Sequence, residues 1–267
     1  MKQISILGCG WLGLPLAKAL LKKGFLVKGS TTSMEKIPLI KTAGIEPFII
    51  QLEEEKISDS ITDFLADSQI LIIDIPPKLR GNSNENFVAK IATLIPFVEN
   101  STIEKVLFVS STSVYGEDNE LVTEAAPLNP DTEGGRQLVI VERLLQKNSC
   151  FETTILRFGG LIGQDRNPVR FLSGRENIEN PDAPINLIHQ EDCIGIIEKI
   201  IELDSWNKTY NAVAPFHPTR KEYYTQKAAD LNLALPKFVP SNTMAGKTIL
   251  SDTLKNSLQY SFIKPTL

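Results

Sequence analysis

The sequence predicts an α/β protein with a doubly wound parallel sheet and a small C-terminal cap. Short β-rich runs alternate with helical periods from the N-terminus to Arg157, which is typical of a parallel sheet covered by helices on both faces. After Arg157 this rhythm breaks into a stretch rich in loops, arginine and proline, which indicates a smaller C-terminal part. The 267 residues suffice for one such domain with an appendage.

Six strands and five helices are expected in alternating order before the break. Branched apolar runs predict strands at Ile4 to Leu7, Phe25 to Gly29, Pro47 to Leu52, Ile70 to Ile75, Val106 to Ser110 and Thr153 to Arg157. Helical spacing of apolar residues predicts helices near Leu12 to Lys23, Met34 to Thr42, Ser58 to Leu65, Asn84 to Glu99 and Arg136 to Lys147. Beyond the loop-rich Gly159 to Pro184, residues 185–203 predict a strand and a helix that rejoin the sheet. Thr209 to Ala214 predicts one more strand, and the tail from Pro215 a helical cap.

Composition narrows the class of partner. A net charge of -4 without a basic cluster argues against nucleic acid and against an anionic membrane, which leaves small molecules. Cys9, Cys150 and Cys193 show no CxxC spacing, so we expect neither a disulfide framework nor a metal site. The apolar N-terminal run is interrupted by Lys18, which disfavours a signal peptide, and no window reaches the roughly 18 apolar residues of a membrane helix. We expect a soluble, cytoplasmic protein.

The strongest motif is GCGWLG, which follows the strand ISIL and opens an amphipathic helix. In a dinucleotide-binding turn Gly8 permits the sharp turn, Gly10 lets the backbone approach a pyrophosphate, and Gly13 lets the helix pack closely on the sheet. Trp11 and Leu12 lie in the same turn and are also expected to bind the cofactor, whose pyrophosphate would sit on the free N–H groups and the positive dipole end of the helix. The alternative is an ordinary glycine turn.

The end of the second strand decides between the two nicotinamide dinucleotides. An NAD site has an Asp or Glu here for the ribose 2′-hydroxyl, whereas a 2′-phosphate requires that carboxylate to be absent. The sequence has Ser30, Thr31 and Thr32 at this position, with Lys36 one turn further. Hydroxyls and a lysine favour NADP(H), with NAD possible. The same residues also suit a helix start with Ser33 as N-cap.

Two further strand ends are expected to border the dinucleotide. Ile75, Pro76 and Pro77 end the fourth strand, where the prolines are compatible with a strand end lacking further ladder partners. The fifth strand runs into VSSTSVYG and delivers hydroxyl groups, beginning with Ser110, at its carboxyl end.

At this point the sequence resembles the extended short-chain dehydrogenases/reductases, the NAD-dependent epimerase/dehydratase superfamily with a Rossmann fold. The resemblance rests on GCGWLG, SSTSVYG, LRFGGLIG and NLIHQEDCIG, and it is closest to an atypical branch of YeeZ-like proteins through GWLGLPLA, NPDTEGGR and YNAVAPFHPTR. These matches span almost the whole chain. One departure is Leu7, which stands where extended members commonly carry the first glycine of GxxGxxG.

The resemblance implies which residues form the site, and it also indicates that the catalytic pair of the family is absent. Ser111 matches the family serine that polarises the substrate carbonyl. Aligning the helix through Glu142 places Gly134 and Leu138 at the positions of the family's catalytic Tyr-x-x-x-Lys pair. A phenol must have its pKa brought toward neutrality by nearby positive charge before it can shuttle protons, and neither glycine nor leucine can do this.

Several neighbours are candidates for the missing acid. Thr132 and Arg136 repeat the four-residue spacing of the Tyr-x-x-x-Lys pair and are candidates for a proton relay. Alternatively, Thr132 is the N-cap of the helix, and Arg136 is either a clamp for an anion or a solvated charge. Tyr115 is the tyrosine nearest this strand end, and Tyr223 and Tyr224 lie in the tail.

Further polar residues receive weaker assignments. A structural role is expected for His189 and Asp192 at a strand-to-helix junction, and His217 lies in a loop that can reach the crevice. An anionic substrate is suggested by arginines in the region where the family binds substrate, namely Arg157, Arg166, Arg170 and Arg175.

Two functional hypotheses arise from these observations. The first is an NAD(P)-dependent oxidoreductase or epimerase/dehydratase that moves a hydride to or from a small carbonyl or sugar-like substrate. The alternative is a catalytically inactive NADP(H)-binding sensor. Residues 1–158 and 185–214 would form the dinucleotide-binding domain, and residues 159–184 and 215–267 a substrate or lid region. The resemblance implies a monomer or a homodimer. A β-hydroxyacid dehydrogenase, which shares the GxGxxG turn, would need a long helical C-terminal domain with a catalytic lysine, and the C-terminal tail of this chain is too short for one.

Overall fold

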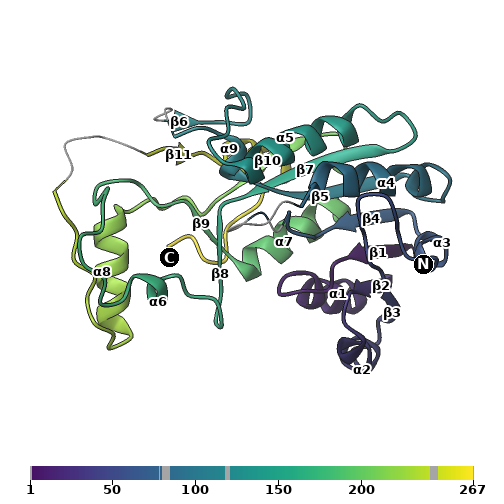
Figure 1. Cartoon of the computed structure of the whole chain (residues 1–267), viewed down its shortest axis with the longest axis horizontal. Coiled ribbons are helices and arrows are strands. Elements are labelled where there is room, and N and C mark those ends of the chain that lie inside the picture. Colours follow the sequence, from purple (N-terminus) through teal and green to yellow (C-terminus); the bar gives the residue numbers. More distant parts are fainter. Residues whose placement is uncertain (1, 78, 80–84, 118–120, 241–245, 267) are drawn as a thin grey trace.

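A computed structural model describes residues 2–77, 79, 85–117, 121–240 and 246–266. Its centre is a seven-stranded parallel sheet with the strand order β10-β7-β5-β4-β1-β2-β3 (Figure 1). The order reverses direction beside β1, as in a doubly wound fold. The strands are β1 (Gln3–Leu7), β2 (Leu26–Thr31), β3 (Glu46–Ile49), β4 (Ile70–Ile73), β5 (Lys105–Ser111), β7 (Glu152–Phe158) and β10 (Thr209–Ala212).

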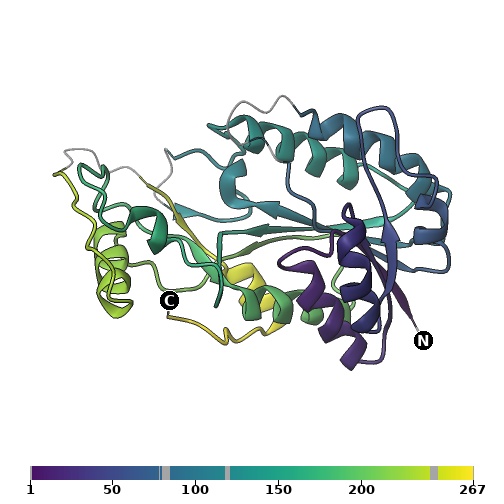
Figure 2. The ribbon, with the colours of Figure 1, turned by 60° about the horizontal axis from the view of Figure 1, so that its bottom comes forward.

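Helices cover both faces of the sheet, on opposite sides in Figure 2. One core lies between the sheet and the helices α1, α7 and α9, and the other lies between the sheet and α3, α4 and α5. The predicted doubly wound fold is thereby confirmed. The helices are α1 (Gly13–Lys22), α2 (Ile37–Thr42), α3 (Ile61–Leu65), α4 (Phe87–Glu99), α5 (Glu133–Gln146), α6 (Val169–Leu172), α7 (Gln190–Glu202), α8 (Arg220–Asp230) and α9 (Asp252–Leu258).

Several helices begin at a capping residue. The Asn86 side chain accepts a hydrogen bond from the Ala89 N–H and so begins α4, whereas the predicted start at Asn84 lies outside the described residues. Thr219 and Glu222 form a reciprocal capping box at the start of α8. Two single-turn 3₁₀ helices also occur: η1 (Met34–Lys36) lies between β2 and α2, and η2 (Thr112–Val114) lies directly after β5.

Four short strands pair outside the main sheet. β8 (Gly160–Ile162) pairs with β9 (Leu187–His189), and β6 (Leu121–Val122) pairs with β11 (Thr248–Ile249). The prediction that the strand near residue 187 rejoins the main sheet is therefore wrong. The edge position beside β7 is taken by β10, and within the described ranges β9 pairs with β8 alone. No helix in the described ranges is long and apolar enough to cross a bilayer.

The C-terminal tail is fastened to the sheet layer by a buried acid. Asp192, in the first turn of α7, accepts hydrogen bonds from the Tyr260 hydroxyl and from the N–H groups of Ile263 and Lys264. Helices α6 and α8 lie together beyond the carboxyl ends of the strands, at the left of Figure 1. This arrangement leaves the ends of β1, β4 and β5 facing the C-terminal part of the chain.

Candidate functional site

The glycine turn between β1 and α1 is shaped by two close backbone contacts. Gly8 has φ +112, and a Cβ there would lie 2.3 Å from the carbonyl oxygen of Asp74. A Cβ on Gly13 would lie 2.1 Å from the Gly8 carbonyl oxygen. Gly10 differs, because a Cβ there would meet nothing within 4 Å. The turn is thus pressed against the end of β4 while Gly10 faces open space.

The same turn offers unsatisfied hydrogen-bond donors. The N–H of Cys9 donates to Ser30 O, and that of Gly10 donates to Gly8 O. In the described part of the chain, the N–H groups of Trp11 and Leu12 have no acceptor. The first turn of α1 also contains no acidic side chain. Free N–H groups at the positive end of a helix dipole form a place for an anion, so the residues present fit a dinucleotide pyrophosphate.

The hydroxyls at the end of β2 are placed differently from the prediction. β2 continues to Thr31, and Ser30 and Thr31 are buried. The Ser30 hydroxyl accepts from the Gly8 N–H at 2.9 Å, so Ser30 shapes the turn. Ser33 occupies the N-cap position of η1 with an extended backbone, as predicted, but its hydroxyl makes no capping hydrogen bond, and its N–H donates to Thr31 Oγ1. Only Thr32 and Lys36 of the predicted phosphate ligands are exposed.

The end of β4 contributes a carboxyl group that sequence reasoning missed. Asp74 directly follows β4, and its carboxyl group accepts a hydrogen bond from the Gly13 N–H. Burial raises the pKa of Asp74 to about 8. The signal was present in the sequence as an acid directly after the apolar run ILII. Beyond it, Ile75 and Pro77 are half-buried and Pro76 is exposed.

The two serines that end β5 point to different surroundings. Ser111 is half-buried, and its Oγ accepts from the Ser113 N–H at 3.1 Å, which leaves its own O–H available as a donor. Ser110 is buried and donates to Glu142 Oε1 at 2.6 Å. The assignment of Ser110 to the cofactor is therefore corrected, because its hydroxyl is engaged inside the protein.

Tyr115 belongs to a buried network and not to an open site. Its side chain is 1% exposed, and its hydroxyl donates to Asn211 Oδ1 at 2.8 Å while accepting from Arg157 Nη1 at 2.6 Å. Arg157 in turn forms a buried ion pair with Glu142 at 2.6 Å. Burial raises the pKa of Tyr115 despite the neighbouring guanidinium. The expectations of Tyr115 as proton donor and of Arg157 at the substrate are both corrected.

The proposed relay at the start of α5 is also corrected. Thr132 Oγ1 accepts a hydrogen bond from the Gly135 N–H at 3.1 Å, so Thr132 is the N-cap of α5, which was the alternative prediction for this residue. Arg136 is exposed and pairs with Glu133 one turn away at 2.9 Å. A capping hydroxyl and a guanidinium paired in solvent do not form a proton relay.

The two glycines at the start of α5 differ in the space around them. A Cβ on Gly135 would lie 2.3 Å from the Ser113 carbonyl oxygen, so packing against η2 excludes any side chain. A Cβ on Gly134 would meet nothing within 4 Å. Leu138, one turn further, is buried in the core. Space for a larger side chain therefore remains at Gly134, whereas position 138 faces apolar surroundings.

The remaining candidates lie away from the strand ends or have structural partners. Tyr223 is buried edge-to-face against Tyr224, and burial raises its pKa to about 12. His189 Nδ1 accepts from the Glu191 N–H and so caps α7. His217 Nδ1 lies 3.1 Å from Ile185 O. His189 thus has the predicted structural role, whereas His217, which was expected in a loop that can reach the crevice, contacts the backbone of Ile185.

A lysine from the C-terminal tail reaches the site and was also missed. Lys247 is buried, donates to the Tyr115 carbonyl oxygen at 2.7 Å and pairs with Glu117 at 2.8 Å. It fastens β11 to the turn that comes after β5. A tail lysine more than a hundred residues away gives no sequence signal that would place it there.

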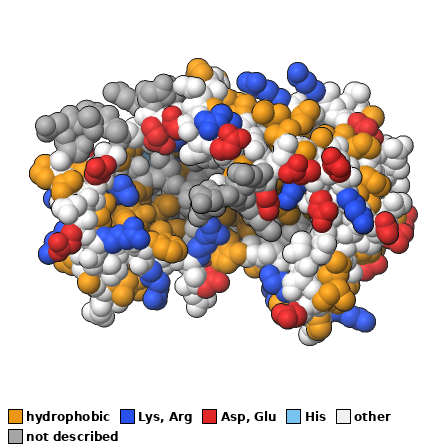
Figure 3. All heavy atoms as spheres, viewed as in Figure 1, with side chains coloured by type: hydrophobic (Ala, Val, Ile, Leu, Met, Phe, Trp, Pro, Cys, Tyr) orange, Lys and Arg blue, Asp and Glu red, His pale blue; other side chains and the backbone are white. Residues whose placement is uncertain are grey.

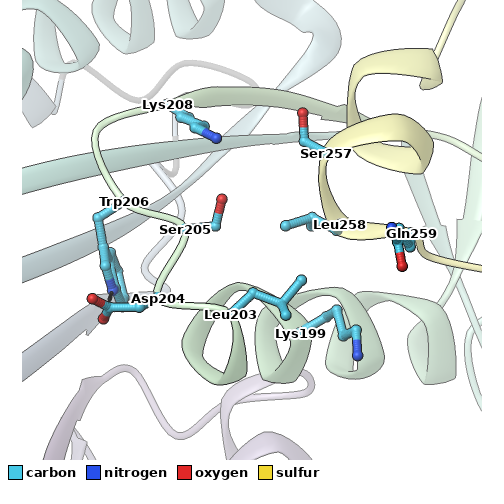
Figure 4. Close-up of a pocket in the computed structure, with 9 residues that line it drawn as sticks. All are labelled: Lys199, Leu203, Asp204, Ser205, Trp206, Lys208, Ser257, Leu258 and Gln259. Carbon is cyan, nitrogen blue, oxygen red and sulfur yellow. Dashed lines mark hydrogen bonds between the residues drawn. The ribbon is translucent and has the colours of Figure 1, made fainter.

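A separate cavity of about 410 Å³ lies at the opposite, amino-terminal edge of the sheet, beside the start of β10 (Figure 4). It is enclosed by the end of α7, the loop after it and the end of α9, and Lys199, Lys208 and Ser257 are among its lining residues. Acidic and basic side chains are interspersed over the face of the molecule in Figure 3. The glycine turn, and not this cavity, gathers the features that bind a ligand.

Comparisons with known proteins agree with this geometry. No protein-family model matches the chain. Escherichia coli protein YeeZ is 34% identical over 267 residues, which covers 99% of this chain and 97% of YeeZ. A solved structure from Methylobacillus flagellatus, assigned as an NAD-dependent epimerase/dehydratase, is 26% identical with a TM-score of 0.79, over 99% of this chain and 94% of that one.

A third comparison concerns the fold alone. Bacillus cereus UDP-glucuronic acid 4-epimerase, solved in complex with NAD, is 18% identical with a TM-score of 0.77, over 98% of this chain and 94% of that one. The sheet and its covering helices are thus those of the short-chain dehydrogenase and epimerase fold. The chain belongs to the YeeZ family, within the NAD-dependent epimerase/dehydratase type of Rossmann fold.

Proposed function

We propose that the chain binds a nicotinamide dinucleotide at the glycine turn and uses it on a small carbonyl or sugar-like substrate. The observation that carries this proposal is the pair of free N–H donors on Trp11 and Leu12, at the start of α1 and at the carboxyl edge of the sheet. The NAD complex of the Bacillus cereus epimerase supports it. When bound, the dinucleotide supplies or accepts the hydride.

The chain's own residues would bind and orient the reactants. Ser111, with its O–H free at the end of β5, donates a hydrogen bond to the substrate carbonyl. Residues 1–158 and 185–214 hold the dinucleotide, and residues 159–184 and 215–267 hold the substrate. Arg170 and Arg175, both exposed in the second region, favour an anionic substrate.

NADP(H) is the preferred dinucleotide in this proposal. β2 ends without a carboxylate that would accept a ribose 2′-hydroxyl, and Thr32 and Lys36 are exposed just beyond it. An ammonium group and a hydroxyl suit a 2′-phosphate.

A second candidate function is a binding protein without turnover that reports on NADP(H). It is favoured by the surroundings of Ser111: the Tyr115 hydroxyl is engaged in the core, and glycine and leucine occupy positions 134 and 138. Under this proposal the dinucleotide binds without subsequent hydride transfer.

The test has two stages. Calorimetric titration of cofactor-free protein with NADPH, NADP⁺, NADH and NAD⁺ measures binding and the effect of the 2′-phosphate. Nicotinamide absorbance is then monitored with a panel of carbonyl compounds and UDP-sugars, using Ser111→Ala as the matched control. Turnover that needs Ser111 supports the first function, whereas binding without turnover across the panel supports the second. Absence of binding to all four dinucleotides contradicts both.

A further inference from the structure

The glycine turn is fastened to the loop after β8 through Trp11. The indole Nε1 donates to Asp165 Oδ1 at 2.7 Å, and the guanidinium carbon of Arg166 lies 5.1 Å from the centre of the indole ring. On the backbone side, Gln190 Nε2 donates to Trp11 O at 2.6 Å. Trp11 is therefore held by its ring edge, its ring face and its carbonyl oxygen.

The loop that carries Arg166 is itself defined by short-range contacts. The Gly163 N–H donates to Arg166 O at 3.0 Å, and the Arg166 N–H donates to Gly163 O at 3.1 Å. A Cβ on Gly163 would lie 2.7 Å from Cζ2 of Trp11, so the indole packs directly on that glycine. The backbone contacts of residues 163–166 therefore fix the position of Arg166 over the indole, in addition to the conformation of its side chain.

Arg166 brings a positive charge to a turn that lacks one. The sequence GCGWLG and the first turn of α1 contain no lysine or arginine. Arg166 is exposed and forms no ion pair with any residue in the ranges that the structure describes. The guanidinium thus lies over the side chain of Trp11, whose backbone N–H is free, and it has no acidic partner in the described ranges.

We propose that Arg166 is a ligand for the pyrophosphate of the dinucleotide and that the Trp11 side chain positions it for this role. This inference rests on the proposed function. A pyrophosphate carries full negative charge, whereas backbone N–H groups and a helix dipole supply only partial positive charge. A guanidinium can present its face to an indole and its N–H groups to phosphate oxygens at the same time.

The test separates the pyrophosphate from the rest of the ligand. ADP-ribose and adenosine are titrated calorimetrically into the wild-type chain and into Arg166→Met, which keeps an unbranched side chain without charge. We expect Arg166→Met to weaken ADP-ribose binding about tenfold or more and to leave adenosine binding unchanged. Arg143→Met is the matched control, because Arg143 is an exposed arginine near the end of α5 to which no binding role is assigned.

Variants of Trp11 test the positioning role. Trp11→Ala is expected to weaken ADP-ribose binding as Arg166→Met does, and the double variant should lose little more, because the two residues act together. Trp11→Phe keeps a ring face but loses the bond to Asp165, so a smaller loss is expected. In a Trp206→Phe background Trp11 is the single tryptophan, and its fluorescence should change when ADP-ribose binds.

The possible failures are distinguishable. Wild-type affinity for ADP-ribose in folded Arg166→Met, or equal losses in Arg166→Met and Arg143→Met, would overturn the assignment of Arg166 while leaving the proposed function intact. If the wild-type chain binds neither ADP-ribose nor any dinucleotide, the proposed function fails and the assignment of Arg166 fails with it.

Discussion

A carboxyl oxygen of Asp74 accepts a hydrogen bond from the backbone N–H of Gly13, which joins the end of β4 to the first residue of α1. The groups that face Asp74 from other elements include the thiols of Cys9, before α1, and Cys193, in α7. Burial raises the pKa of both thiols, so they stay neutral at ordinary pH. Among the described residues, no positively charged side chain contributes to the pKa of Asp74, the acid beneath the glycine turn.

Stability should fall as the pH rises toward 8. Burial raises the pKa of Asp74 from 3.8 to about 8. Between these values the folded chain holds a proton that the unfolded chain has released, so the free energy of unfolding decreases with increasing pH. Urea unfolding at several pH values should show a smaller decrease in Asp74→Asn than in the wild type. Asp59→Asn, at an exposed position, serves as control, and equal slopes in the wild type and Asp74→Asn would contradict the prediction.

Alanine variants of the two serines that end β5 should have different effects: one on turnover and the other on stability. Ser111→Ala removes a donor at the strand end, so we expect unchanged stability, unchanged dinucleotide affinity and loss of any turnover. Ser110→Ala removes the bond to buried Glu142, which should cost about 1 to 2 kcal/mol in the free energy of unfolding. Urea unfolding and calorimetry measure both effects, and a larger stability loss in Ser111→Ala would contradict this account.

The buried ion pair should matter far more than the exposed one. Glu142→Gln leaves the Arg157 charge buried without its partner, and we expect a loss of about 3 to 5 kcal/mol. Glu133→Gln breaks the exposed pair with Arg136 and should cost no more than about 1 kcal/mol. Urea unfolding compares the two glutamine variants directly. Similar losses in both would show that the Glu142 environment is not as enclosed as the structure has it.

The adjacent glycines of α5 should respond oppositely to alanine. Gly135→Ala places a methyl group 2.3 Å from the Ser113 carbonyl oxygen, so η2 must move and stability must fall. Gly134→Ala meets open space inside a helix, where alanine is favoured over glycine by about 1 kcal/mol. Thermal unfolding of the pair checks this, and a stabilised Gly135→Ala would contradict the packing.

The preference for the 2′-phosphate should depend on Lys36. Lys36→Ala is expected to weaken NADP⁺ binding several-fold and to leave NAD⁺ binding unchanged, because only NADP⁺ presents the phosphate. Calorimetric titrations with both dinucleotides make the comparison, and Lys41→Ala in the neighbouring helix α2 is the control. An equal effect on the two dinucleotides would exclude Lys36 as a phosphate ligand.

The main sheet could be predicted because most of its strands contain local apolar runs and most of the helices between them have a local apolar period. The burial of Ser30 and Ser110 could not be predicted in this way, since a strand covered on both faces gives no alternation to mark the inward side. The pairing of β9 depends on β10 taking the edge of the sheet beside β7, which is a competition between distant segments.

The site was predicted least well where it depends on contacts between distant residues. The glycine spacing is a local signal and located the turn. Tyr115, which directly follows η2, contacts groups from α5, β7 and β10 in its network, and its hydroxyl donates to Asn211 in a strand 96 positions further along the chain. Trp11 and Asp165 are separated by 154 positions. No local pattern distinguishes a tyrosine held in such a network from one free to transfer a proton.

The measurement that tests the central claim most directly is a calorimetric titration of the wild-type chain and Gly10→Ala with NADPH. A methyl group at Gly10 meets no protein atom within 4 Å, so the variant should fold with unchanged stability while filling the space over the turn. We predict saturable, equimolar binding to the wild type and markedly weaker binding to Gly10→Ala. Absence of binding to the wild type, or equal binding to both chains, would contradict a dinucleotide site at this turn.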